Sequence, residues 1–169
     1  MILTLFGQPD VDTVHDLSIA PCSNYSLVMS LIADWHSVLP NPLPGWKVAF
    51  LVSAPNYAPV AVATWGRPIA RMEDQVSTLE LTRQAHGPAA PRNTGTWMLG
   101  KMRRWIRENM PEITRLISYQ DADKHHGTIY KADNWRITGD LLIGSASWGN
   151  RSGRAVTERP HKIKWERVP

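Results

Sequence analysis

The chain has 169 residues, of which 43% are hydrophobic and 20% are charged, a composition that suits one compact domain and excludes wholesale disorder. Its one cysteine, Cys22, excludes an intramolecular disulfide and a multi-cysteine zinc site, which fits a reducing cytosol. The N-terminal stretch lacks the basic start and long apolar run of a signal peptide, and no segment reaches the ~20 apolar residues that cross a bilayer. We therefore expect a soluble, intracellular protein with no membrane partner.

Two patterns of hydrophobicity alternate along the chain. Period-two alternation and short apolar runs predict strands over residues 14–19, 46–52, 59–65, 77–83, 114–119 and 138–147. Helical spacing predicts helices from a cap at Ser23 or Asn24 to about residue 36, over 98–109, and over 126–135. This order, β-α-β-β-β-α-β-α-β, predicts an α/β fold with a mixed (α+β) sheet and helices on its faces.

The net charge of +4 is concentrated near the C-terminus. Residues 151–169 carry six basic and two acidic side chains, so this stretch alone accounts for the excess. Basic tails bind polyanions through counterion release, although a solvated terminus that only aids solubility has the same composition. The candidate nucleic-acid contacts are Arg151, Arg154, Arg159, Lys162 and Lys164.

The stretch 117–135 combines an apolar strand with a polar turn and a short helix. The strand is predicted to end near Asp121, and strand ends in open α/β sheets are where ligands usually bind. Asp121 could orient an amine or accept its proton, or it could cap the following helix. That helix carries Tyr130, which could act as a proton donor or pack in the core with its hydroxyl paired.

A second candidate site is the loop PRNTG at 91–95, which leads directly into a helix. A helix N-terminus offers unpaired N–H groups and a partial positive charge, both suited to a pyrophosphate. Arg92, Asn93, Thr94 and Gly95 are the candidate cofactor-binding residues. The alternative is that Asn93 or Thr94 simply caps the helix.

The strand–loop–helix at 77–107 and the strand–helix at 114–135 resemble the GNAT acyltransferase fold. More narrowly, four segments resemble the Mom-type DNA-modification proteins of bacteriophages, a divergent GNAT-like group. These segments are WHS at 35–37, ELTR at 80–83, PRNTG at 91–95, and SYQD with HHGTIYKADNW at 118–121 and 125–135. The resemblance covers roughly residues 30–140. We accordingly expect a GNAT-like domain over 1–148 and a basic C-terminal tail over 149–169.

The resemblance also implies roles for four catalytic candidates, Tyr130, Asp121, His36 and Arg83. Tyr130 would protonate the departing thiolate of acetyl-CoA or a related acyl-CoA, and Asp121 and His36 would position the acceptor amine. His36 and Asp121 are also weak candidates for a metal site. Arg83 lies three residues from Glu80, so the two side chains point to opposite faces of a strand unless a bulge intervenes.

By this resemblance the protein modifies phage DNA in the cytoplasm of an infected bacterium. It would add a carbamoyl-methyl or acyl-type group to the N6 amine of adenine, with the base flipped out of double-stranded DNA, and so evade restriction. One alternative is an acetyl-CoA-dependent N-acetyltransferase that acts on a small-molecule or protein amine. Another is a non-catalytic DNA-binding or host-inhibiting module on the same fold.

Overall fold

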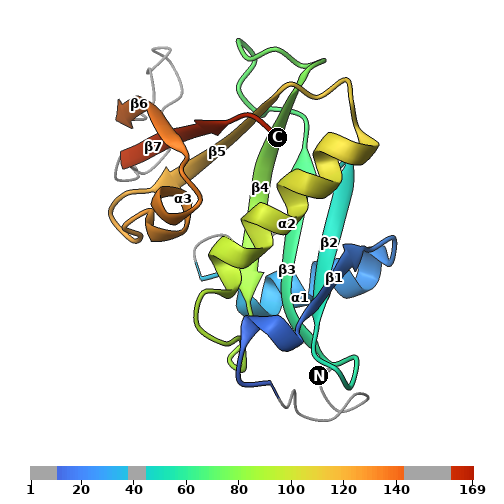
Figure 1. Cartoon of the computed structure of the whole chain (residues 1–169). Coiled ribbons are helices and arrows are strands. Elements are labelled where there is room, and N and C mark those ends of the chain that lie inside the picture. Colours follow the sequence, from blue (N-terminus) through green and yellow to red (C-terminus); the bar gives the residue numbers. More distant parts are fainter. Residues whose placement is uncertain (1–10, 38–44, 143–160) are drawn as a thin grey trace, which may run out of the picture.

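A computed structural model describes residues 11–37, 45–142 and 161–169. It contains one seven-stranded sheet in the order β1-β2-β3-β4-β5-β7-β6 (Figure 1). The strands are β1 (Ser18–Pro21), β2 (Val48–Ser53), β3 (Pro59–Gly66), β4 (Thr78–His86), β5 (Arg115–Asp121), β6 (Arg136–Leu142) and β7 (His161–Arg167). The helices are the 3₁₀ turn η1 (Val14–Asp16), α1 (Tyr25–Trp35), α2 (Thr94–Asn109) and α3 (Thr128–Ala132). The predicted mixed α/β sheet is confirmed, because β4 and β5 are parallel while the other neighbouring strands are antiparallel.

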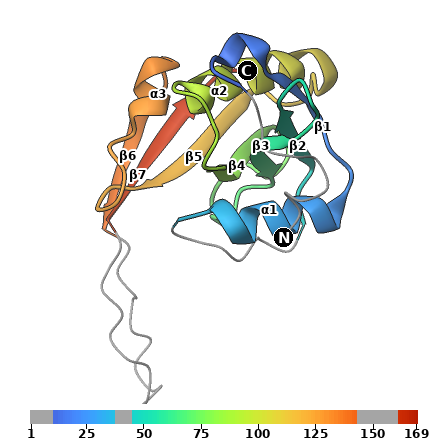
Figure 2. The same cartoon turned by 90° about the horizontal axis from the view of Figure 1, so that it is seen from below.

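The sheet is covered on both faces (Figure 2). Helix α1 begins where Asn24 Oδ1 accepts the N–H of Leu27 at 3.1 Å, as the sequence predicted, and its apolar stripe packs on one face. Helix α2 packs on the opposite face through its own apolar stripe. The stripe of α1 is Val28, Leu31 and Ile32, and that of α2 is Met98, Leu99, Met102 and Ile106. Each of these buried side chains contributes roughly 1.5–3 kcal/mol relative to its exposed state, so the two stripes hold both helices to the sheet.

Strands β4 and β5 pair only at one end. Their parallel register runs from Thr78 opposite Arg115 to Leu81 opposite Ser118. Strand β4 then continues to His86 and β5 to Asp121, and the two diverge (Figure 1). The middle of the sheet is therefore split, with the apex of the split at Leu81 and Ser118.

A β-bulge lies in β4 beside this apex. Thr64 of β3 is opposite Arg83 while the next residue, Trp65, is opposite Leu81, so Thr82 is an extra residue in β4. Leu81 packs in the core under α2, which places Glu80 on the α1 face. Without the bulge Arg83 would point to the α2 face, but the extra residue brings it to the α1 face with Glu80.

The prediction of a basic tail over 149–169 is wrong for residues 161–167. Residues 161–167 form β7, which pairs with β5 on one side and β6 on the other, so they belong to the domain. Within this strand Ile163 and Trp165 alternate with charged residues, and Trp165 is buried, with its Nε1 donating to Gln120 Oε1 at 2.7 Å. Because the stretch is rich in basic residues, its alternation of apolar and charged side chains, which is typical of a strand, was not recognised. Residues 149–160 lie outside the described part of the chain.

The remaining differences are local. The strand predicted over 14–19 is a 3₁₀ turn followed by β1, because Thr13 Oγ1 accepts the N–H of His15 at 3.2 Å and closes a turn there. The helix predicted over 126–135 is reduced to α3, since Gly127 at its start has a left-handed φ of 67°. The strand predicted over 138–147 begins earlier than expected, at Arg136.

Candidate functional site

The hydroxyl of Tyr130 lies at the apex of the split between β4 and β5. Its oxygen is 2.8 Å from Ser118 Oγ, and Ser118 Oγ in turn donates to the carbonyl of Leu81 at 3.4 Å. Ser118 and Leu81 are the last paired residues of the two strands. The structure therefore places a phenol where the sheet opens.

Packing holds the Tyr130 ring from two sides. The ring stacks on Trp165 with centroids 5.3 Å apart and meets the edge of Trp135 at 5.5 Å. Burial raises the pKa of the Tyr130 phenol, and the hydrogen bond with Ser118 only partly offsets this. The phenol therefore keeps its proton at neutral pH, which a proton donor requires.

A pocket of about 320 Å³ lies on the α2 face, where α2 begins. It is lined by His86, Gly87, Ala90, Pro91, Asn93, Thr94, Gly95, Thr96, Thr128 and Ile129. Three of the four cofactor-binding candidates thus line one pocket, while Arg92 is exposed in the same loop. The loop and the start of α3 come together here although they are far apart in the sequence.

The first residues of α2 line this pocket. Asn93 is left-handed, with φ 70°, and its side chain caps no N–H group of the described residues, so the simple capping alternative does not hold for Asn93. Thr94 instead closes the loop, because its Oγ1 donates to the carbonyl of Pro91 at 2.7 Å. The N–H groups of Gly95 and Thr96 precede the first hydrogen bonds of the helix and carry its partial positive charge, which suits an anionic group.

The α1 face of the split carries a different set of groups. Glu80 and Arg83 are 3% and 8% exposed. Burial raises the pKa of the Glu80 carboxyl, although the N–H of Ile69 donates to its Oε2 at 2.8 Å and nearby cations oppose the shift. A buried carboxylate with a raised pKa is a better proton acceptor than an exposed one.

His36 joins this set from the end of α1. Burial lowers its pKa from 6.5 to about 4, and the positive charges of Arg83 and His125 add to the effect. His36 is therefore neutral at pH 7 and within electrostatic range of Arg83. His36 and Arg83, which are remote in the sequence, thus lie within electrostatic range of each other on this face, and Glu80 joins them although it was not among the candidates taken from the sequence.

Asp121 stands at the end of β5 and shapes a turn. Its Oδ1 accepts the N–H of Asp123 at 3.1 Å, and its carbonyl accepts the N–H of His125 at 3.0 Å. The residue at the start of α3 is Gly127, so Asp121 does not cap that helix. Among the residues that the structure describes, no three His, Cys, Asp or Glu side chains gather closely enough to bind a metal ion.

Two of the predicted nucleic-acid contacts lie on β7. Lys164 forms an ion pair with Glu73 and its side chain is only 13% exposed, which makes it a poor contact for phosphate. Lys162 is partly exposed, and its charge acts on the Glu80 carboxyl. Arg151, Arg154 and Arg159 fall outside the described residues.

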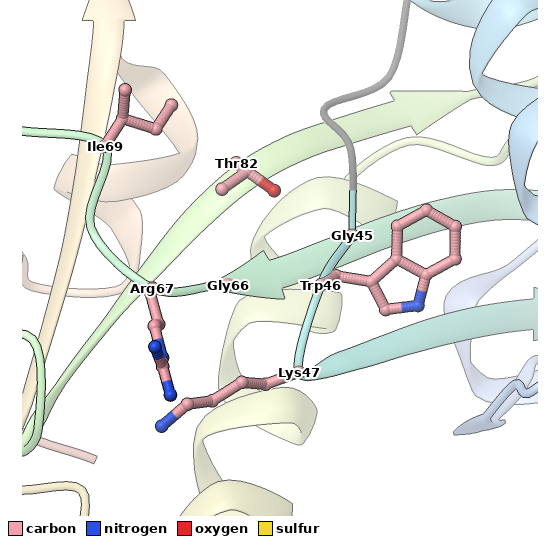
Figure 3. A pocket seen from close by; sticks show the side chains of 7 residues that line it. All are labelled: Gly45, Trp46, Lys47, Gly66, Arg67, Ile69 and Thr82. Atoms are coloured by element: carbon pink, nitrogen blue, oxygen red, sulfur yellow. The ribbon is translucent and has the colours of Figure 1, made fainter.

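A second pocket, of about 430 Å³, was not foreseen from the sequence. It is lined by Gly45, Trp46, Lys47, Gly66, Arg67, Ile69 and Thr82 (Figure 3). The charged ends of Lys47 and Arg67 point to the same side of the pocket (Figure 3). Thr82 is the extra residue of the bulge, and no local sequence signal marks it. None of the helices within the described ranges is long and apolar enough to span a membrane.

Comparison with solved structures shows the fold. The ribosomal-protein-alanine N-acetyltransferase of Brucella melitensis matches with a TM-score of 0.63 and 14% identity, over 90% of this chain and 99% of that one. Spermidine N-acetyltransferase of Vibrio cholerae, solved with CoA and spermine, matches with a TM-score of 0.61 and 7% identity, over 91% and 96%. An acetyltransferase of the GNAT family from Streptococcus pneumoniae gives 0.61 and 10%, over 90% and 98%. The domain therefore has the GNAT acetyltransferase fold.

Sequence comparison identifies the family. A search of curated protein sequences finds no match to this chain. The model of the Mom protein family matches residues 56–164, which is well over half of the chain and includes β3 to β5, α2, α3 and most of β7. This agrees with the resemblance inferred from the motifs, and the chain belongs to the Mom protein family.

Proposed function

We propose that this protein is a DNA-modifying enzyme that adds a carbamoyl-methyl or acyl-type group to the N6 amine of adenine and so protects phage DNA from restriction. Membership of the Mom family and the GNAT fold support this proposal. The observation that carries it is the split between β4 and β5. The split has a proton donor, Tyr130, at its apex, an anion-suited pocket on one face and a buried proton acceptor on the other.

The pocket at the start of α2 suits acetyl-CoA or a related acyl-CoA. The N–H groups of Gly95 and Thr96 and the exposed guanidinium of Arg92 are donors for a pyrophosphate, and Asn93 and Thr94 shape the loop that holds it. Bound there, the cofactor would supply an activated acyl group as a thioester, and its transfer to N6 would form an amide and release the CoA thiol. A carbamoyl-methyl group is attached through its methylene carbon, so that product would require a donor other than a thioester. The V. cholerae enzyme with the same fold was solved with CoA, which supports this choice of donor.

The residues around the apex divide the proton transfers between them. Tyr130 donates its proton to the leaving group, a role that typically contributes ~10²–10⁴ in rate. The lone pair of the adenine amine is delocalised into the ring, so a base must remove a proton as the new bond forms. We assign this role to Glu80, because its carboxyl is buried and its pKa is raised. Neutral His36 accepts a hydrogen bond from the amine, and Asp121 at the strand end orients it.

The acceptor would be an adenine held outside its duplex. Its N6 amine lies within the base stack, so the enzyme must extrude the nucleotide or act on opened DNA. The charge of Arg83 lies beside Glu80 and His36, where it suits an electron-rich ring edge. The arginines at 151, 154 and 159 remain predicted phosphate contacts.

Nucleoside mass analysis of plasmid DNA from expressing cells tests this function. Wild-type protein should yield a new adenine adduct, and Tyr130→Phe should reduce it by about 10²-fold or more. Tyr57→Phe, at an exposed turn that contributes no residue to either pocket, is the matched control and should retain full modification.

Two other outcomes would replace the proposal. Acetyl-CoA turnover on amines without any change in DNA would favour an ordinary N-acetyltransferase. Salt-dependent DNA binding that survives Tyr130→Phe, with no adduct from any variant, would favour a non-catalytic binding module.

A further inference from the structure

The loop that joins β3 to β4, residues 67–77, exposes several large apolar side chains at the end of the sheet. Met72 is 97% exposed and Ile69 is 58% exposed, and Val76 is also exposed. Single exposed apolar residues are ordinary, but several within one short loop indicate an interaction surface. We call residues 67–77 the β3–β4 loop.

This exposure does not come from a loosely attached loop. The N–H of Ile69 donates to the buried carboxylate of Glu80 at 2.8 Å. The side chain of Gln75 spans the loop, since its Nε2 donates to the carbonyls of Ala70 and Glu73 at 3.2 and 3.1 Å. The loop is therefore braced internally and fixed to β4, and it presents Met72 in a defined position.

Ion pairs fix the loop to the other half of the sheet. The carboxylate of Glu73 bonds to Arg115 Nη1 at 2.7 Å and also pairs with Lys164. These residues belong to β5 and β7, so the loop bridges the two halves of the sheet that separate at the split. A side chain on a loop anchored in this way can press against a ligand while the loop keeps its conformation.

The outward charge around the apolar tip is mainly positive. Arg67 and Arg71 of the loop are exposed, and Lys47 is also exposed, with its charged end on the same side of the pocket as that of Arg67 (Figure 3). Of the two acids in the loop, Glu73 is neutralised by its partners, and Asp74 accepts hydrogen bonds from Ser77 and the N–H of Val76. An apolar side chain flanked by cations is complementary to a step between two DNA base pairs, because that step lies between two negatively charged phosphate backbones.

Given the proposed function, on which this step rests, we infer that the β3–β4 loop enters the DNA duplex as a wedge. Met72 occupies the space that the extruded nucleotide leaves, and Arg67, Arg71 and Lys47 hold the neighbouring phosphates. Ile69 is exposed on the loop and also lines the 430 Å³ pocket, so the wedge is continuous with a cavity that can receive the extruded base. The N–H of Ile69 also donates to Glu80, which connects this wall of the cavity to the proposed proton acceptor. Apolar wedges of this kind offset the cost of unstacking a base step.

Binding to a damaged duplex tests the wedge without requiring catalysis. A duplex with one abasic site has already lost the stacking that the wedge must replace, so the full-length protein should bind it about tenfold more tightly than the intact duplex. In Met72→Ala the ratio of the affinity for the abasic duplex to that for the intact duplex should fall toward one. The matched control is Tyr57→Asn, which alters a 78% exposed side chain at the far end of β3 and should leave the preference unchanged. Asn suits the left-handed φ of 63° at that position.

The salt dependence of DNA binding tests the cationic part of the surface. Arg67→Gln and Arg71→Gln should each reduce the slope of log affinity against log salt by about one, for intact and abasic duplexes alike. A wild-type protein without abasic preference, or a Met72→Ala variant that keeps it, would overturn the inference. A Met72→Ala variant that converts a dimer into a monomer would also overturn it, because the surface would then join two copies of the chain.

These outcomes separate the wedge from the proposed function. If wild type forms the adenine adduct while Met72→Ala keeps both adduct and abasic preference, the wedge fails and the function stands. If the preference depends on Met72 but no adduct forms, the wedge stands and the function fails.

Discussion

His36 provides a test of the site that needs neither DNA nor cofactor. Burial, with the charges of Arg83 and His125, lowers its pKa from 6.5 to about 4. Between these values the unfolded chain binds a proton at His36 and the folded chain does not. The free energy of unfolding therefore falls as the pH drops from about 6.5 toward 4, and this contribution is absent above 6.5.

The magnitude follows from the same pKa values. The difference from 6.5 to about 4 corresponds to at most about 3.4 kcal/mol, of which linkage places about 2 kcal/mol at pH 5. His36 is only half-buried, and solvent screens part of this interaction, so we expect about 1 kcal/mol at pH 5. The variant His36→Gln lacks the titrating group and should escape this loss.

The assay is urea unfolding of wild type and His36→Gln at pH 7.5 and pH 5. Relative to wild type, the variant should gain about 1 kcal/mol between the two conditions. His15→Gln, at an exposed position of η1, is the matched control for removing a histidine. An unchanged difference between wild type and His36→Gln at both pH values would refute the placement of His36 in a buried, cationic environment beside β4.

Three further substitutions test the supports of the site by urea or thermal unfolding. Asp133→Ala should cost about 3 kcal/mol, because it leaves the largely buried guanidinium of Arg103, bonded at 2.8 and 2.9 Å, without its partner. Gly127→Ala should cost about 2 kcal/mol or more, since its φ is 67° and a Cβ there would collide with the side chain of Gln120. Tyr130→Phe should cost only about 1 kcal/mol, the value of one buried hydrogen bond, so its loss of activity would not reflect unfolding.

The substitutions of Asp133 and Gly127 each have a control in the same chain. Glu108→Ala removes an exposed carboxylate near the end of α2 and should be nearly neutral. Gly45→Ala tests backbone strain alone, because its φ is 85° but no described atom lies within 4 Å of the position that its Cβ would take. If Gly127→Ala proved no more costly than Gly45→Ala, the steric argument at Gly127 would be wrong.

The elements with a strong local signal were predictable. Asn24 as a cap, the helix that follows it and the strands β2 and β3 all depend on residues close together in the sequence, and the structure confirms them. The motif around Tyr130 likewise pointed to the Mom family, which the family comparison bears out. The strand predicted at 14–19 failed because the side chain of Thr13 stabilises a turn that period-two alternation cannot reveal.

The arrangement of the site depended on pairings between distant strands. Sequence spacing alone put Glu80 and Arg83 on opposite faces, and only the register of β4 against β3 shows that Thr82 is an extra residue that reverses this. Similarly, the basic composition of residues 161–167 gave no reason to place them beside β5, where the burial of Trp165 under α3 decides their position. Local patterns determined which segments form helices and strands and which side chains carry chemistry. Tertiary structure decided which of those side chains share a face, because bulges, strand order and the split between β4 and β5 depend on contacts with partners far away in the chain.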